Sequence, residues 1–273
     1  MSHSRISGRT AGIAAGTVAL ALGAAVTLGL SSAGAASAAV SPHLSTTVAP
    51  GGNFNLSVWE LQLPIGSTGS PTTISPSQLE GSNGFQDKYF FTNTTDGSMS
   101  FFDPEKGVTT ANSKFPRSEL REMNSNGTPA GWTPPGTHTL TATVKATAIP
   151  DHVAVGQIHL GENSGSTKPL LELFYYKNGN VVLAIEQTPA GGNEVLHTVG
   201  NVPNGTKWNY VISLTNNSVI GLNLNGTNHT FTMPSSFNGL PMYFKAGDYD
   251  QTAGSSTTLG AKVQFYALTV HHS

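Results

Sequence analysis

Alternation of apolar and polar residues with a period of two is the dominant pattern beyond residue 53. It is clearest at 138–145, 208–215 and 220–224, where apolar residues occupy almost every second position and mostly polar residues lie between them. Alternate side chains of a strand lie on opposite faces, so this pattern predicts antiparallel strands with one face buried.

Turn signals separate these runs. Asn178-Gly179 and Asn225-Gly226 each lie between two strand-like runs, and Asn-Gly in that setting is typical of a β-hairpin. The loop at Asn178-Gly179 could have two residues or slightly more. Helix is scarce: the best candidate is one or two turns from Pro76, with Ser75 as cap and Gln78 completing a capping box.

Many short strands, little helix and 31 glycines predict an all-β protein. A β-sandwich with the jelly-roll arrangement is the architecture that this pattern favours. From residue 53 to residue 273 we find no linker, no repeat and no long run of charge, so we expect one domain.

The first 38 residues have the features of a secretory signal peptide. Arg5 and Arg9 precede an uncharged stretch at 11–30, and Ala36-Ser37-Ala38 fits a cleavage site. A retained membrane anchor is the alternative, since the stretch is just long enough to span a bilayer. We expect cleavage after Ala38, a secreted, extracellular protein free of the membrane, and a flexible segment at 39–52.

Charge and cysteine content exclude several functions. Beyond the leader the chain has 11 basic and 15 acidic residues, a formal charge of −4, which argues against a broad surface for nucleic acid or an anionic membrane. A polyanionic substrate would need a local basic cluster. The chain has no cysteine, which excludes thiol catalysis and zinc–thiolate sites. We expect a monomer.

Three short strand-like segments carry the candidate chemistry. In the first, Arg117, Glu119 and Arg121 share a face; in the second, Gln157 and His159 do; the third is 243–251, where Tyr243, Lys245 and Tyr249 share a face. Cations, an amide, an imidazole and a phenol on strand faces suit a site that grips a carboxylate and moves a proton beside it.

These segments, in this order and at these separations, resemble the alginate lyases of polysaccharide lyase family 7. The resemblance extends over most of the chain beyond the leader, including 59–64 and 101–113. It implies a jelly roll with alginate bound along a concave sheet face, and catalytic roles for Arg117, Gln157, His159 and Tyr249. Further substrate-binding candidates are Glu119, Arg121, Lys245, Tyr243, Gln251 and Asn112, with Glu119 expected chiefly to orient Arg117 or Arg121. No metal or cofactor is expected.

Cleavage of a uronic-acid polymer by β-elimination sets clear requirements. The C5 proton beside the substrate carboxylate must be removed, so donors must neutralise that carboxylate, a base must lie near C5 and an acid must protonate O4. Arg117 suits the carboxylate and Gln157 can donate to it. Family members are described with Tyr as both base and acid, or with His as base and Tyr as acid, and the sequence leaves both open.

Two positions bear on specificity and local potential. In the resembling family Ile at position 158 tends to accompany action on guluronate-containing stretches, and Val accompanies mannuronate preference. The third segment carries Asp248 and Asp250, where many relatives have an apolar residue and Asn. We expect both aspartates to point away from Tyr249.

Three alternatives remain at this stage. A non-catalytic carbohydrate-binding jelly roll would use exposed aromatics such as Trp132 or the Tyr175-Tyr176 pair. A glycoside hydrolase would need two carboxyl groups, drawn from Glu119, Glu172 and Glu186. A lyase acting on another polyuronate, such as polyglucuronate, would differ only in its substrate.

Overall fold

The computed structural model describes residues 43–273, so the predicted signal peptide and the first residues of the segment 39–52 lie outside the described residues. Residues 43–52 are packed against the domain rather than free of it. Leu44 and Ala49 are buried, the backbone N–H of Ala49 donates to Ser82 O at 2.9 Å, and helix α1 (Pro50–Asn53) begins before the predicted boundary. The few apolar residues in this Ser/Thr/Pro-rich stretch are enough to anchor it.

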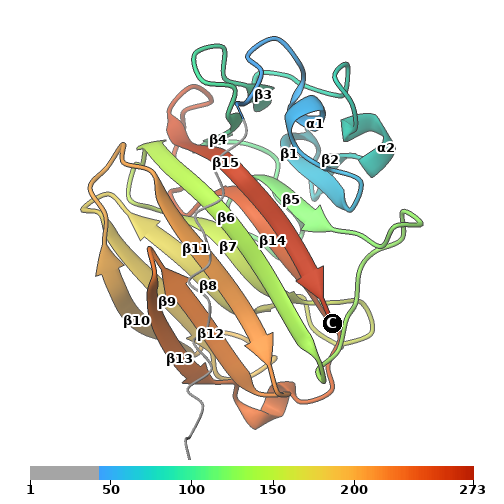
Figure 1. The fold of residues 1–273 in the computed structure, drawn as a ribbon, viewed down its shortest axis with the longest axis vertical. Helices are drawn as coiled ribbons and strands as arrows, with labels where there is room; N and C mark the ends of the chain where they lie inside the picture. The colour runs from blue at the N-terminus through green and yellow to red at the C-terminus, as the bar shows by residue number, and fades with distance from the viewer. Residues whose placement is uncertain (1–42) are drawn as a thin grey trace, which may run out of the picture. The chain divides into compact units, whose positions relative to one another are not determined.

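Two antiparallel sheets form the domain, as the alternating pattern predicts (Figure 1). The eight-stranded sheet has the order β10 (Glu194–Asn201), β9 (Asn180–Glu186), β8 (Pro169–Tyr176), β7 (His152–Leu160), β14 (Met242–Asp250), β5 (Ser118–Glu122), β1 (Trp59–Ser67), β2 (Ser70–Ile74). The seven-stranded sheet has the order β13 (Thr227–Thr232), β12 (Val219–Leu224), β11 (Trp208–Thr215), β6 (Thr137–Ala148), β15 (Gly260–His272), β4 (Met99–Pro104), β3 (Phe90–Thr92).

Local expectations are confirmed at the hairpins and the short helix. Asn225 and Gly226 form a two-residue turn with φ of 49° and 90°, as a type I′ turn requires, while 177–179 is a three-residue loop. Helix α2 (Pro76–Leu79) follows Ser75, whose N–H donates to Gln78 Oε1 at 3.1 Å. The only other helical element among residues 43–273 is a 3₁₀ turn, η1 (Ser235–Phe237).

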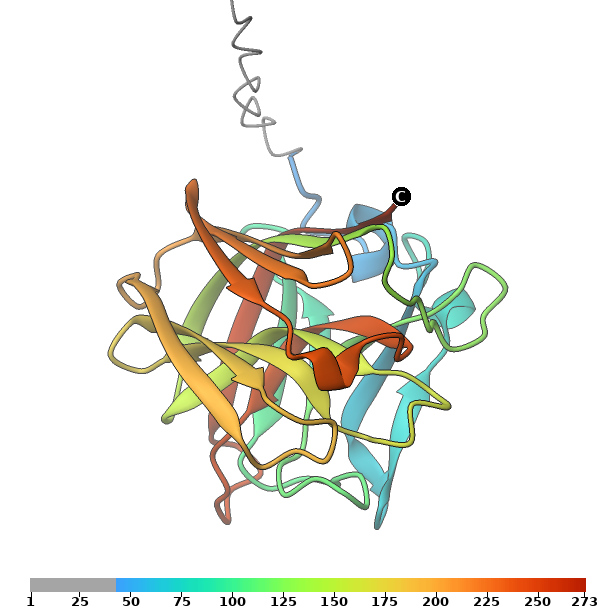
Figure 2. The ribbon, with the colours of Figure 1, turned by 90° about the horizontal axis from the view of Figure 1, so that it is seen from below.

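The sheets lie one above the other, with the main hydrophobic core between them (Figure 2). Strand β14 shows how each face of the eight-stranded sheet is used. Its residues Met242, Phe244 and Ala246 belong to the core, whereas Tyr243 and Lys245 point to the outer face. This alternation leaves one face of the sheet free for a site.

An irregularity in β7 decides which of its residues reach that outer face. Val153 and Val155 point into the core, but so do Ile158 and Leu160, so the alternation shifts by one residue at Gly156. Tyr210, from the opposite sheet, donates its hydroxyl to Val155 O at 2.8 Å. A Cβ atom at Gly156 would lie 2.8 Å from that hydroxyl oxygen. The bulge therefore depends on glycine and turns Gln157 and His159 outward.

A cluster of three aspartates lies on the core side of β14. Asp103, Asp248 and Asp250 are completely buried, and the N–H of Asp250 donates to Asp103 Oδ2 at 2.9 Å. Asp248 and Asp250 thus lie opposite Tyr249, as expected. Burial raises the pKa of Asp248 well above its usual range, and the neighbouring Asp103 and Asp250 carboxyl groups raise it further.

We expect Asp248→Asn to stabilise the protein more at pH 8 than at pH 5. The folded state holds the Asp248 proton more tightly than the unfolded state, where aspartate titrates near pH ~4. The protonated Asp248 carboxyl group therefore contributes to the stability of the fold below that pH. This contribution is lost as pH rises through the raised folded-state pKa. Thermal melts at both pH values should show it, since each kcal/mol moves Tm by roughly 2–4 °C. Exposed Glu80→Gln is the control; an Asp248→Asn melt lower than wild type at both pH values would contradict the prediction.

Candidate active site

A groove of about 790 Å³ crosses the outer face of the eight-stranded sheet from β1 to β10. Two loops flank it, 110–115 before β5 and 161–168 after β7. The loops meet where Asn112 Nδ2 donates to Thr167 Oγ1 at 3.5 Å. The groove thus runs across the strands, and its volume is in the range of ligand-binding sites.

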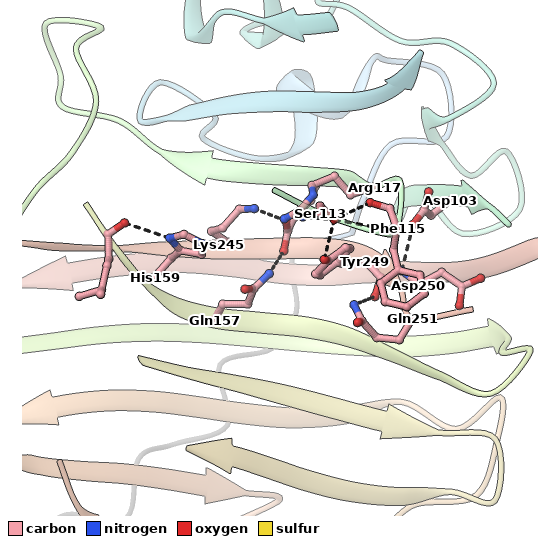
Figure 3. Close-up of polar contacts among 12 residues, drawn as sticks. Asp103, Ser113, Phe115, Arg117, Gln157, His159, Lys245, Tyr249, Asp250 and Gln251 are labelled. Atoms are coloured by element: carbon pink, nitrogen blue, oxygen red, sulfur yellow. Dashed lines mark hydrogen bonds and ion pairs between the residues drawn. The ribbon is translucent and has the colours of Figure 1, made fainter. Parts of the chain in front are cut away.

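Glu119 organises the floor of the groove. Its Oε2 accepts from Arg117 Nη1 at 3.1 Å and pairs with Lys245 Nζ at 2.5 Å, while its Oε1 accepts from Gln157 Nε2 at 2.5 Å (Figure 3). Gly247 lies opposite Glu119 in the ladder, and a Cβ atom there would lie 2.7 Å from Glu119 Cα. One carboxylate therefore fixes three donors, which come from β7, from β14 and from the residue directly before β5.

Glu119 lies beneath the groove rather than in its lining, whereas it is expected from the sequence among the substrate-binding candidates. It is 0% exposed and does not line the groove, because its carboxylate is enclosed by the three groups that it holds. Its orienting role concerns Arg117, whereas Arg121 lies over the ring of Tyr243 at 4.4 Å. Gln251 also falls outside the groove lining; its side chain donates to Tyr249 O at 3.2 Å.

Two cations against one carboxylate leave the centre of the groove positive. Burial and then the charge of Arg117 lower the pKa of Lys245, which is about 8 although the charge of Glu119 opposes the change. Burial also disfavours the charge on Arg117, but the carboxylate of Glu119 more than offsets this and the pKa of Arg117 is raised. An incoming carboxylate would complete the charge balance, so this is an anion site.

Tyr249 is held from two sides. Its hydroxyl lies 2.9 Å from Ser113 Oγ, and Arg117 Cζ lies 3.7 Å from its ring centroid. Ser113 Oγ also lies 2.8 Å from Phe115 O and accepts from Arg117 Nη2 at 3.2 Å (Figure 3). These contacts hold the phenol hydroxyl in the groove, where it can pass a proton to an oxygen of the substrate.

His159 presents an acceptor nitrogen. Its Nδ1 lies 2.9 Å from Leu160 O, and because a carbonyl only accepts, Nδ1 carries the proton and Nε2 has a lone pair. Burial lowers the pKa of His159 to about 3, and the charge of Lys245 contributes. The imidazole is thus neutral at neutral pH, and its Nε2 is available as a base.

Arg117, Gln157, His159 and Tyr249 all line this groove, together with Tyr243, Lys245, Arg121 and Asn112. Neutralising donors, a base and a proton donor therefore lie around one space, which suits abstraction of a proton beside a carboxylate. Sequence reasoning did not identify the contact of Ser113 with Tyr249 or the contact of Tyr210 with β7. Their roles arise from contacts between distant segments, which no local pattern reveals.

Several of the residues that a carbohydrate-binding module or a glycoside hydrolase would use are engaged elsewhere in the structure. Tyr175 is buried in the core, and the ring of Trp132 stacks on His138 at 4.1 Å, so neither is a free sugar platform. Glu119 is enclosed, and Glu186 accepts from the backbone N–H groups of 187, 192 and 193.

Within residues 43–273 no group of three or more His, Cys, Asp or Glu is arranged for a metal ion. No helix in that range has the length and apolarity to cross a bilayer.

Comparisons with known proteins agree with the geometry. Residues 54–272 match the family model described as alginate lyase. An alginate lyase of Klebsiella pneumoniae is 26% identical, with 85% of this chain and 94% of that protein covered. The crystal structure of alginate lyase A1-II′, a member of polysaccharide lyase family 7, superposes with a TM-score of 0.74 at 35% identity, covering 82% and 99% of the two chains. Variants of A1-II′ were solved with the product GGG and the substrate GGMG.

Alginate lyase PA1167 from Pseudomonas aeruginosa superposes with a TM-score of 0.73 at 32% identity, covering 80% of this chain and 99% of that one. The two packed sheets of this chain match the jelly roll of these neighbours, as the sequence predicts.

Proposed function

The chain belongs to the alginate lyases of polysaccharide lyase family 7, and from this we propose that it cleaves guluronate-containing stretches of alginate by β-elimination. The observation that carries the proposal is the convergence of Arg117, Gln157, His159 and Tyr249 on one groove. These four side chains supply every group that the elimination requires.

Arg117 and Gln157 bind the substrate carboxylate in this mechanism. Both are already fixed by Glu119, so little reorganisation accompanies binding. Neutralising the carboxylate acidifies the C5 proton, and the same donors hold the negative charge that develops as the proton leaves. Preorganised donors of this kind contribute roughly 3–4 kcal/mol each to the transition state.

Proton transfer is divided between His159 and Tyr249. Nε2 of His159 takes the C5 proton, and the electrons of the C5–H bond form the C4=C5 double bond. The C4–O4 bond breaks, and O4 receives the proton of the Tyr249 hydroxyl. Guluronate carries its C5 proton anti to the leaving oxygen, so a base and an acid on two different residues suit it better than one tyrosine.

The guluronate preference is supported by Ile158, which the family associates with guluronate-containing stretches. Ile158 is completely buried in the core, so its effect on the groove acts through the position of β7. Its neighbours Gln157 and His159 are the residues whose placement it would change.

We expect His159→Ala to damage cleavage of polyguluronate at least ~100-fold and any cleavage of polymannuronate much less. The physical reason is that only the anti elimination needs a base separate from Tyr249. The measurement is kcat/KM for wild type and variant on both block polymers. Equal losses on the two polymers would mean that His159 chiefly holds the carboxylate. A wild type active only on polymannuronate would exclude the guluronate preference.

Secretion is part of the proposal. We propose that residues 1–38 direct export and are removed after Ala38, which releases a monomer that acts on extracellular alginate and binds neither membrane nor nucleic acid. Expression in a secreting host followed by N-terminal sequencing tests this. A chain that keeps its first residues and stays with the membrane fraction would contradict it.

A further inference from the structure

The hydroxyl group of Ser113 lies between the carboxylate donor and the proton donor of the proposed mechanism. Its Oγ accepts from Arg117 Nη2 at 3.2 Å and lies 2.9 Å from the hydroxyl oxygen of Tyr249 (Figure 3). Ser113 also lines the groove. None of the steps proposed for Arg117 or Tyr249 uses this hydroxyl group, although it contacts both residues.

The loop that carries Ser113 fixes the position of its oxygen. The N–H of Ser113 donates to Thr110 O at 3.1 Å, and the N–H of Phe115 donates to Ser113 Oγ at 3.2 Å. Phe115 O lies 2.8 Å from the same Oγ. The ring of Phe115 packs edge-on against the ring of Tyr249, with 6.4 Å between the centroids. The serine oxygen is therefore preorganised beside the phenol.

The hydrogen-bonding capacity of one hydroxyl group limits what Ser113 can offer to Tyr249. A serine oxygen has two lone pairs and one proton. Arg117 and Phe115 each donate an N–H to this oxygen, and these two bonds fill its lone pairs. What remains for the contact with Tyr249 is the proton of Ser113 itself. The Tyr249 proton is then left free for an oxygen of the substrate.

The proton of Ser113 has two acceptors within reach. Phe115 O lies 2.8 Å from Oγ and the Tyr249 hydroxyl oxygen lies 2.9 Å from it. Rotation about the Cβ–Oγ bond moves the proton from one acceptor to the other, and no heavy atom has to move. The hydroxyl group can therefore respond to a change of charge on either acceptor.

Such a change occurs on Tyr249 during the proposed reaction. When the phenol passes its proton to O4, its oxygen becomes a phenolate. The Arg117 guanidinium lies 3.7 Å from the centroid of the ring, whereas Ser113 bonds to the oxygen. A hydrogen bond to a charged acceptor is roughly twice as strong as one between neutral groups. Donation by Arg117 to the serine oxygen strengthens that bond further.

Building on the proposed function, we propose that Ser113 is a positioning residue that turns its hydroxyl proton from Phe115 O to the oxygen of Tyr249 as Tyr249 protonates O4. Ser113 keeps its proton and donates only a hydrogen bond, while O4 keeps the proton of the phenol. After the unsaturated product leaves, water returns a proton to the phenolate and takes the C5 proton from His159. The hydrogen bond is stronger in the transition state than in the ground state, so it acts on kcat more than on KM.

A double-mutant cycle between Ser113 and Tyr249 tests the proposal. On alginate at pH 7 we expect Ser113→Ala to lower kcat at least ~10-fold and to change KM less than about twofold, because the phenolate loses a hydrogen bond. In the Tyr249→Phe background the same substitution should change kcat less than about twofold, since no phenolate forms there. A defect in the loop or in the alignment of Arg117 would instead lower kcat in both backgrounds.

Two further variants and a thermal melt of each protein complete the experiment. Ser113→Thr keeps a hydroxyl group, so we expect its kcat to stay within about threefold of wild type. Ser166→Ala is the matched control: Ser166 also lines the groove, but its hydroxyl donates to Pro189 O and to no side chain of the site. Its kcat should change less than about threefold.

Three results would overturn the role of Ser113. They are wild-type kcat in Ser113→Ala, a loss of the same size in the Tyr249→Phe background, and a loss in Ser113→Thr or Ser166→Ala equal to that in Ser113→Ala. The second would mean that Ser113 acts on Arg117 or on its loop rather than through the phenol. Failure of the proposed function looks different, because the wild type would then give no unsaturated product from alginate at pH 7.

Discussion

Tyr249→Phe is expected to lower kcat on alginate by at least ~100-fold with little change in KM, because the variant loses the proton that the leaving O4 receives. The ring remains, with the Arg117 guanidinium 3.7 Å from its centroid, and Ser113 keeps its bond to Phe115 O. The change thus removes one hydroxyl and no packing. Steady-state kinetics together with a thermal melt separate loss of chemistry from loss of fold.

Tyr243→Phe is the matched control for this prediction. Tyr243 lies on the same strand, lines the same groove and loses the same atom, but its ring lies beside His159 and Arg121 rather than at the Ser113 end. We expect it to lose less than about tenfold in kcat. Near-normal turnover of Tyr249→Phe, or equal losses in the two variants, would exclude the phenol of Tyr249 as the acid.

Glu119→Gln is expected to reduce both activity and stability, although the residue does not line the groove. Its carboxylate pairs with Arg117 and Lys245 and accepts from Gln157. Without the charge of Glu119, the two buried cations Arg117 and Lys245 face each other. Removing one partner of such a buried network lowers the free energy of unfolding by about 3–5 kcal/mol. Because the donors of the substrate carboxylate are then no longer aligned, we expect kcat/KM to fall at least ~100-fold.

The pH dependence of Glu119→Gln provides an independent check. The charge of Glu119 raises the pKa of Lys245, so its removal lets burial and Arg117 lower that pKa further below about 8. Activity should then decline at lower pH than in wild type, since Lys245 loses its charge as pH rises. Glu60→Gln, an acid of the groove on β1, is the control and should keep the wild-type profile. Wild-type kcat/KM in Glu119→Gln would remove Glu119 from the mechanism.

Much of the fold follows from local sequence. The alternating segments 138–145 and 208–215 form parts of the half-buried strands β6 and β11. Asn225-Gly226 forms the predicted turn, with the positive φ angles that such a turn requires. The shared faces of the three motifs also follow from strand geometry alone. Period-two patterns are local, so they can be recognised in a single sequence without knowing which strands pair with one another.

Other features depend on contacts that no local pattern contains. The outward direction of Gln157 and His159 rests on a bulge at Gly156, which Tyr210 of the opposite sheet holds. Alternation alone cannot show that Glu119 lies beneath the groove rather than in it. In the same way, the packing of 43–52 rests on single apolar residues such as Leu44. The overall composition of the segment, which is rich in Ser, Thr and Pro, does not reveal the effect of one such residue.

The most direct test of the account is a single assay of the purified protein on alginate in the presence of a chelator, with ultraviolet absorbance and reducing ends followed together. Polyglucuronate and a neutral glucan are the comparison substrates. The account predicts that alginate alone gives rising absorbance in step with new reducing ends, because each elimination leaves a C4=C5 double bond conjugated to the carboxylate. Reducing ends without absorbance, or activity that returns only when calcium is added, would contradict it.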